Sequence, residues 1–129
     1  MLIDEQLAAK VLEAALEQGG EFAELYVERS RSTTLSLEDS RLERSSTGLD
    51  AGASIRITSG RALSFVSHDS PEEAPLLDAV RPAGAGLAGS GAAAGLKHLA
   101  PLPDPSPQVI KTPPSTVAAA EQAAPLTAA

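Results

Sequence analysis

The chain has 129 residues, of which 43% are hydrophobic, yet it holds only two Phe, one Tyr and no Trp. Because much of the hydrophobic content is alanine, which buries little area, we expect a small core built from scattered Leu, Val and Ile. The formal net charge of −7, with ten basic residues spread among acids, argues against a nucleic-acid surface, which needs clustered Lys and Arg.

Cysteine is absent, so the chain has no disulfide framework and no thiol nucleophile, as is typical of a reducing compartment. The N-terminal sequence MLIDEQLAAK is acidic and lacks the basic and apolar regions of a secretory signal. The run at 83–96 is too short and too rich in glycine to span a bilayer. We therefore expect a cytoplasmic protein with neither membrane nor nucleic acid as a partner.

Residues 4–18 are predicted to form an amphipathic helix, with Asp4 as its cap and Gly19 and Gly20 as its stop. An apolar stripe at helical spacing indicates which side of this helix packs on the rest of the domain. Its members are Leu7, Ala8, Val11, Leu12, Ala15 and Leu16.

From residue 22 the apolar period changes to two, which is typical of β-strands. Leu63 and Phe65, for example, share one face of the last strand of this region. Tight connections at Asp39–Ser40 and Ser59–Gly60 require neighbouring strands to be antiparallel. The pattern predicts about five short strands, over 22–30, 33–39, 41–47, 53–59 and 61–67.

The sequence SPEE at 70–73 predicts the start of a second helix, over 70–81, whose apolar stripe packs on the sheet. It offers a serine cap, a proline at the first helical position and a glutamate that completes a capping box. Pro75 is expected to remove one hydrogen bond early in this helix, and Pro82 is expected to end or kink it.

These elements predict an α+β domain over residues 1–82, in which two helices flank the antiparallel sheet. Residues 83–99 are rich in Gly and Ala and are expected to be only marginally helical. Residues 100–129 are a Pro/Ala-rich linker or disordered tail, extended in solution. Within this tail the sequence favours one short helix, over 116–124, with Ser115 as its cap.

The two histidines do not form a metal or catalytic motif. His68 and His98 lack the spacing of zinc ligands, and an exposed strand end is the favoured interpretation of His68, although Asp69 could orient its ring. The serines at 45–46 have no base nearby in the sequence, and the glycines at 84–95 do not match a nucleotide-binding loop.

The acidic side chains of the strand region are expected to form a solvated sheet face, with a catalytic carboxylate pair as the minor alternative. They are Glu24, Glu28, Glu38 and Glu43. We therefore predict no catalytic residue and no metal ligand in this chain.

The order of features resembles the N-terminal domain of the TldD/PmbA family of zinc metallopeptidases. The resemblance is carried by AELYVERSRSTTLSLEDSRLE (23–43), GASIR (52–56), GRALSFVSHDS (60–70) and PPSTVAAAEQAA (113–124). It covers residues 5–82 well and the rest loosely, and the arginine of GASIR favours the TldD branch. Gly52, Arg56 and Gly60 are the family-motif positions, for which the resemblance implies a structural or interface role.

The family's peptidase centre is an H-E-x-x-x-H helix with a downstream cysteine, in a large C-terminal domain that binds zinc. This sequence has neither feature, so the resemblance implies a truncated member that holds no cofactor and is inactive alone. In the family, the N-terminal domain helps to form a homo- or heterodimer and the chamber that admits unfolded peptide.

Exposed sheet edges that pair with peptide backbone would suit that role, and a sheet that merely packs on its helices is an equal alternative.

A second interpretation of the whole chain is a stand-alone, non-catalytic interaction module that pairs with a full-length family partner. The third is a fragment without a role.

Overall fold

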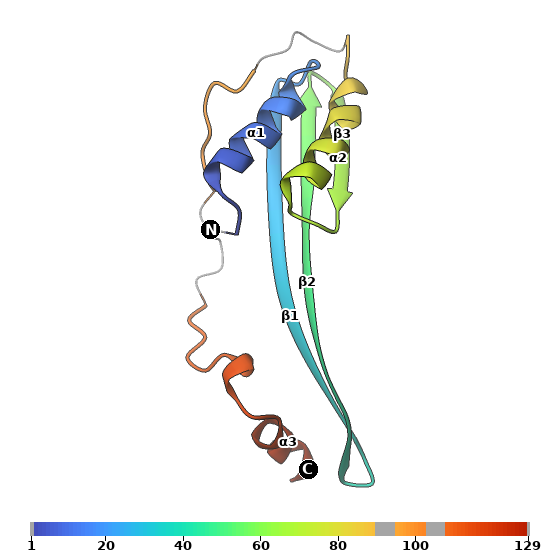
Figure 1. Ribbon diagram of the computed structural model, residues 1–129, viewed down its shortest axis with the longest axis vertical. Helices are drawn as coiled ribbons and strands as arrows, with labels where there is room; N and C mark the ends of the chain where they lie inside the picture. Colours follow the sequence, from blue (N-terminus) through green and yellow to red (C-terminus); the bar gives the residue numbers. More distant parts are fainter. Residues whose placement is uncertain (1, 90–94, 103–107, 129) are drawn as a thin grey trace. The chain divides into compact units, whose positions relative to one another are not determined.

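The computed structural model describes residues 2–89, 95–102 and 108–128. The elements, in chain order, are α1 (Glu5–Leu16), β1 (Phe22–Glu38), β2 (Arg41–Ser59), β3 (Ala62–His68), α2 (Glu73–Ala85), the 3₁₀ helix η1 (Pro114–Thr116) and α3 (Ala119–Thr127) (Figure 1). The strands form an antiparallel sheet of order β1-β2-β3, which confirms the predicted α+β class. No helix within these ranges is both long and apolar enough to cross a membrane.

The chain divides into two compact units. Unit 1 consists of Met1–Ser30 and Asp50–Pro101, and unit 2 consists of Arg31–Leu49 and Leu102–Ala129. Strands β1 and β2 run through both units, because each contributes residues on either side of these boundaries.

The sheet has three strands, so the prediction of about five short strands was wrong. The residues at 30–33 and at 48–52, interpreted as connections, stay extended inside β1 and β2. Neither stretch has the backbone of a turn, because the positive-φ residues of the hairpin are Asp39 and Ser40, at 48° and 59°. A two-residue turn with positive φ at both positions matches the twist of long paired strands, and its predicted place is confirmed.

Helix α1 begins where its sequence predicts. The Oδ1 atom of Asp4 accepts hydrogen bonds from the backbone N–H groups of Gln6, at 2.7 Å, and Leu7, at 3.4 Å. The helix ends at Leu16, and Gly19 then turns the chain with a φ of 132°, which a residue with a side chain rarely adopts.

Helix α2 begins at Glu73, three residues later than predicted. The Oγ atom of Ser70 accepts a hydrogen bond from the N–H of Glu72 at 3.3 Å, in the turn that precedes the helix. The first helical hydrogen bond runs from the N–H of Leu76 to the carbonyl of Glu72, at 3.1 Å. Pro75 therefore occupies a position in the first turn where a backbone N–H would have no helical partner. The prediction that Pro75 removes a helical hydrogen bond was wrong.

The same helix continues past Pro82 to Ala85, so the prediction that it ends near residue 81 was also wrong. Packing on the rest of unit 1 offsets the proline, because Leu77, Val80 and Gly84 are all buried. Residues 86–89 form a turn, and residues 95–99 have no regular structure.

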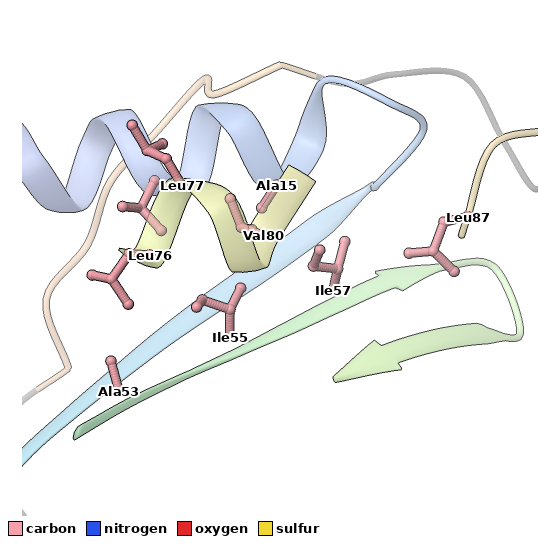
Figure 2. Close-up of a cluster of buried hydrophobic side chains, with 9 residues drawn as sticks. Ala15, Ala53, Ile55, Ile57, Leu76, Leu77, Val80 and Leu87 are labelled. Atoms are coloured by element: carbon pink, nitrogen blue, oxygen red, sulfur yellow. The ribbon is translucent and has the colours of Figure 1, made fainter. Parts of the chain in front are cut away.

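The core of unit 1 lies between the two helices and one face of the sheet. Figure 2 shows Ile55 and Ile57 of β2 below Val80 of α2 and Ala15 of α1. Small residues let the helices approach closely, since a Cβ atom added to Gly84 would lie 3.0 Å from the carbonyl oxygen of Ala15. The buried cluster consists of Val11, Ala15, Ala53, Ile55, Ile57, Leu76, Leu77, Val80 and Leu87.

The C-terminal part of unit 2 contains η1 and α3. The prediction of a helix over 116–124 was wrong in its bounds, because Val117 and Ala118 are extended, with ψ values of 132° and 144°. A glutamine holds the two helices together instead, as Nε2 of Gln122 donates to the carbonyls of Pro114 at 2.7 Å and Val117 at 2.8 Å. The expectations that concern residues 90–94 and 103–107 lie outside the described residues.

Candidate functional site

The sheet of unit 1 has one face that the helices do not cover, which we call the outer face. Along β1, Ala23, Leu25 and Val27 pack against the core, and the residues that alternate with them point the other way. The outer face consists of Phe22, Glu24, Tyr26 and Glu28 from β1, Ser54, Arg56 and Thr58 from β2, and Leu63 and Phe65 from β3.

Aromatic side chains gather on this face. Phe22, Tyr26, Leu63 and Phe65 retain 53%, 60%, 61% and 63% of their accessible surface. Phe22, Phe65 and Tyr26 are the only Phe, Tyr or Trp residues of the sequence, and all three lie on the outer face. The core, in contrast, is built entirely from aliphatic residues and alanine.

Arg56 lies at the middle of the outer face. In the register of β2 and β3 it stands opposite Phe65, and its Nη2 atom forms an ion pair with Oε2 of Glu24 on β1. The two side chains are about half and one third exposed. Together with Tyr26, Ser54 and Phe65 they line a shallow, open depression of about 270 Å³. The arrangement presents a neutralised charge pair surrounded by aromatic rings.

Tyr26 also has a polar partner on this face. Its hydroxyl group donates a hydrogen bond to Oε2 of Glu28 at 2.9 Å. This hydrogen bond and the negative charge of Glu28 raise the pKa of Tyr26 above its ordinary value of 10.0, because both disfavour the phenolate.

The structure gives the three family-motif positions different environments. A Cβ atom on Gly52 would lie 3.2 Å from the carbonyl oxygen of His68, where β2 passes close to the end of β3. Gly60 has a φ of 57°, and its N–H donates to Oε2 of Glu21 at 2.9 Å. Arg56 is the member of the three whose side chain reaches the outer face.

The candidate polar residues belong to different parts of the chain. His68 accepts a hydrogen bond at Nδ1 from the N–H of Ser70, at 3.0 Å, in the turn after β3. Glu24 and Glu28 belong to unit 1, whereas Glu38 and Glu43 belong to unit 2. Within residues 2–89, 95–102 and 108–128, no group of three or more His, Cys, Asp or Glu side chains lies close enough together to hold a metal ion.

The comparisons with known proteins identify the family. The model of "PmbA/TldA metallopeptidase domain 1" matches residues 23–124, which extend from β1 into α3. A search of the curated proteins found no match. Because the family model spans well over half of the 129 residues, the chain belongs to the PmbA/TldA metallopeptidase family, of which it carries domain 1.

Proposed function

We propose that this chain is a non-catalytic domain of the PmbA/TldA family that helps to assemble the peptidase and to admit unfolded peptide, in the cytoplasm. Membership in a metallopeptidase family supports the connection with proteolysis. The sequence, which contains no H-E-x-x-x-H motif and no cysteine, supports a role without its own zinc chemistry. In this proposal the zinc and the hydrolytic step belong to a different part of the assembly.

The free edge of β3 is the observation that carries the proposal. β3 is the last strand in the order β1-β2-β3, so among the described residues no strand pairs with its other side. Natural proteins protect such edges with charges, prolines or bulges. Ala62–Ser67 has no charged residue and no proline, whereas β1, at the other edge, carries Glu24, Glu28 and Arg29.

An extended peptide is the ligand that such an edge accepts. Its backbone N–H and C=O groups would continue the antiparallel hydrogen-bond ladder, independently of the peptide's sequence. Its side chains would lie beside Leu63 and Phe65 on the outer face and beside Val66 on the helix-covered face. This combination favours unfolded, apolar-rich segments over folded proteins.

Isotope-edited NMR of the full chain, titrated with a short peptide of alternating apolar residues, tests the proposal. We expect shifts and slowed exchange at the amides of Ala62–His68. A control peptide N-methylated at every residue should not bind, because neither of its edges can then donate the ladder hydrogen bonds. Equal binding of both peptides, or no response at Ala62–His68 up to the solubility limit, would overturn the role of the β3 edge.

The second candidate function is a stand-alone interaction module that pairs with a full-length family member. The aromatic outer face favours it, because a large exposed apolar patch is typical of a protein–protein contact. Co-purification with a family member that contains H-E-x-x-x-H, together with failure of the peptide titration, would support this candidate over the first.

A further inference from the structure

We propose that the outer face docks a basic amphipathic helix of another protein, with apolar side chains of that helix on Leu63 and Phe65 and a lysine or arginine on Glu28. The inference goes beyond the proposed function, because a helix on the face of the sheet leaves the edge of β3 free and does not require this edge to bind peptide. It rests on the apolar area of the face, on its charges and on the acidity of this chain's own helices.

The apolar part of the outer face is large for a surface in contact with water. The core contains no aromatic residue, whereas Phe22, Tyr26 and Phe65 are each more than half exposed on this face. Together with Leu63 they leave roughly 450 Å² of side-chain surface free, in the range of patches that serve as binding sites on soluble proteins. A helix that covered them would remove about 900 Å² from water on the two partners together, which is typical of a weak, reversible contact.

The charges of the face leave one carboxylate that no cation neutralises. Arg56 is the only basic residue of the outer face, and it forms an ion pair with Glu24. Glu28 has no ion-pair partner among the described residues, and the hydroxyl group that donates to it, from Tyr26, is uncharged. A carboxylate can accept several hydrogen bonds, so Glu28 can still bind the ammonium or guanidinium group of a partner.

The ring of Tyr26 adds to this preference for a cation. Its hydroxyl group lies 2.9 Å from Oε2 of Glu28, so a cation bound to that carboxylate lies close to the ring. The face of an aromatic ring attracts a lysine or arginine within about 6 Å. The apolar stems of these side chains also pack well on exposed rings.

The antiparallel order of the strands puts apolar and acidic residues at opposite ends of the face. Leu63 lies next to the turn between β2 and β3, and Phe22, at the start of β1, lies at the same end. Glu28 lies six residues further along β1, about 20 Å away, a distance that about 13 helical residues span. Three strands are about 10 Å wide between their outer axes, which matches the diameter of one helix.

The charged residues just outside the face strengthen this polarity. Arg61 lies in the turn at the apolar end, whereas Asp50 of β2 and Asp69, directly after β3, lie at the end that holds Glu28. The end with Glu28 therefore attracts a cation, and the other end repels one. The partner helix should carry its Lys or Arg residues about three turns away from its apolar ones.

The helices of this chain have the wrong charge for the face. α1, α2 and α3 each contain one more acidic than basic residue. A second copy that stacked its own outer face here would bring another Glu28, whose charge is equally unneutralised. The occupant that fits is therefore a basic helix of a different protein.

Fluorescence anisotropy of a labelled peptide, titrated with the full chain, tests the inference. The first probe is a helix of about 20 residues with leucines along one end of a stripe, lysines along the other end and alanine elsewhere. The second probe has glutamate in place of every lysine. We expect the lysine peptide to bind in the micromolar range at physiological ionic strength and the glutamate peptide not to bind.

Two charge-reversal variants locate the binding surface. Glu28→Lys reverses a charge on the outer face, and Glu13→Lys makes the same change in net charge at an exposed residue of α1, which packs on the opposite face. We expect Glu28→Lys to weaken binding of the lysine peptide at least about 10-fold and to allow binding of the glutamate peptide. Glu13→Lys should change neither affinity by more than about 2-fold, because salt screens distant charges. Matching circular dichroism shows that both variants are folded.

The single tyrosine gives an independent readout with unlabelled peptide. Tyr26 is the only Tyr and the chain has no Trp, so its emission reports on the outer face. The lysine peptide should protect this emission from quenching by acrylamide. Failure of the lysine peptide to bind, equal binding of both peptides, equal weakening by both variants or an unprotected Tyr26 would each overturn the inference. None of these outcomes depends on the amides of β3, whose response to extended peptide tests the proposed function separately.

Discussion

Tyr26 combines an exposed ring with a hydroxyl group that is bound to a carboxylate. The hydrogen bond to Glu28 connects residues two apart on the same strand, so both side chains stand on the outer face. Ionising the phenol would break the donated hydrogen bond and place two negative charges side by side. The contact thus keeps the ring neutral and favours one orientation of it over the alternatives.

This contact gives a prediction that absorbance spectroscopy can check, because the chain has a single tyrosine. The pKa of Tyr26, measured by ultraviolet titration, should lie above 10.0 in the native chain. Glu28→Gln should move it back toward 10.0, because the amide carries no charge. Glu13→Gln, on a helix that packs against the other face, should leave it unchanged.

The raised pKa also fixes the direction of a stability effect. Since the pKa is higher in the folded than in the unfolded chain, the contact stabilises the fold below pH 10 and ceases to do so as the pH rises through the folded value. A native pKa at or below 10.0 would show that the hydroxyl group is not bound to Glu28 in solution.

At the scale of elements, α2 carries two prolines whose positions have different consequences. Pro75 is the third residue of the helix, where the backbone N–H has no helical partner in any case. Pro82 lies in the interior, where it removes the hydrogen bond to the carbonyl of Asp78 and crowds that carbonyl with its ring. The same residue type is therefore tolerated at one position and costly at the other.

Replacing each proline by alanine should separate these effects. An interior proline costs about 3 kcal/mol relative to alanine, and losing the stiffness of proline in the unfolded chain offsets about 0.4–1 kcal/mol of the gain. We expect Pro82→Ala to raise the free energy of unfolding by about 2–2.6 kcal/mol. Pro75→Ala should lower it by less than about 1 kcal/mol, because only the unfolded-state effect applies. Denaturation by urea measures both, and equal effects of the two substitutions would contradict this account.

The sequence predicts most element types but not all of their bounds. Helix α1 and the hairpin turn follow from local signals, the cap at Asp4 and the polar pair at 39–40. The joining of the predicted short strands into β1 and β2 does not follow from local signals, because the polar stretches at 30–33 and 48–52 have the composition of connections. They stay extended because β1 and β2 are hydrogen-bonded neighbours in one sheet, a constraint that no single segment reveals.

The sequence alone does not predict which residues form the outer face, for a similar reason. In β3 the larger side chains, Leu63 and Phe65, alternate with Ala62, Ser64 and Val66, so hydrophobicity alone would turn Leu63 and Phe65 inward. The register with β2 decides otherwise, because it pairs Ile57 with Ser64 and Ile55 with Val66. The isoleucines face the helices, and the partner residues opposite must face the same way.

At the scale of the whole chain, the two units differ in how much apolar surface they bury. Unit 1 contains the entire buried cluster between its helices and sheet. Among the described residues of unit 2, Ala123 is the buried hydrophobic one, and most of the hairpin between residues 31 and 49 is exposed. A two-stranded ribbon without a covered face is only marginally stable by itself.

Hydrogen exchange should reveal this difference within a single strand. The amides of 53–59, in the unit 1 part of β2, should open only with the core, whereas those of 41–48, in the unit 2 part, should open locally. We expect protection factors at least about 100-fold higher in 53–59.

Ile55→Val provides the discriminating control, because Ile55 is fully buried and this change typically costs about 0.5–1.5 kcal/mol. It should lower protection at 53–59 by roughly 2–10-fold and leave 41–48 unchanged, since local opening of the hairpin does not break the core. Loss of protection in parallel along the whole of β2 would mean that the strand unfolds as one cooperative element. In that case the hairpin would owe its stability to the core of unit 1, and the boundary between the two units would have no energetic meaning.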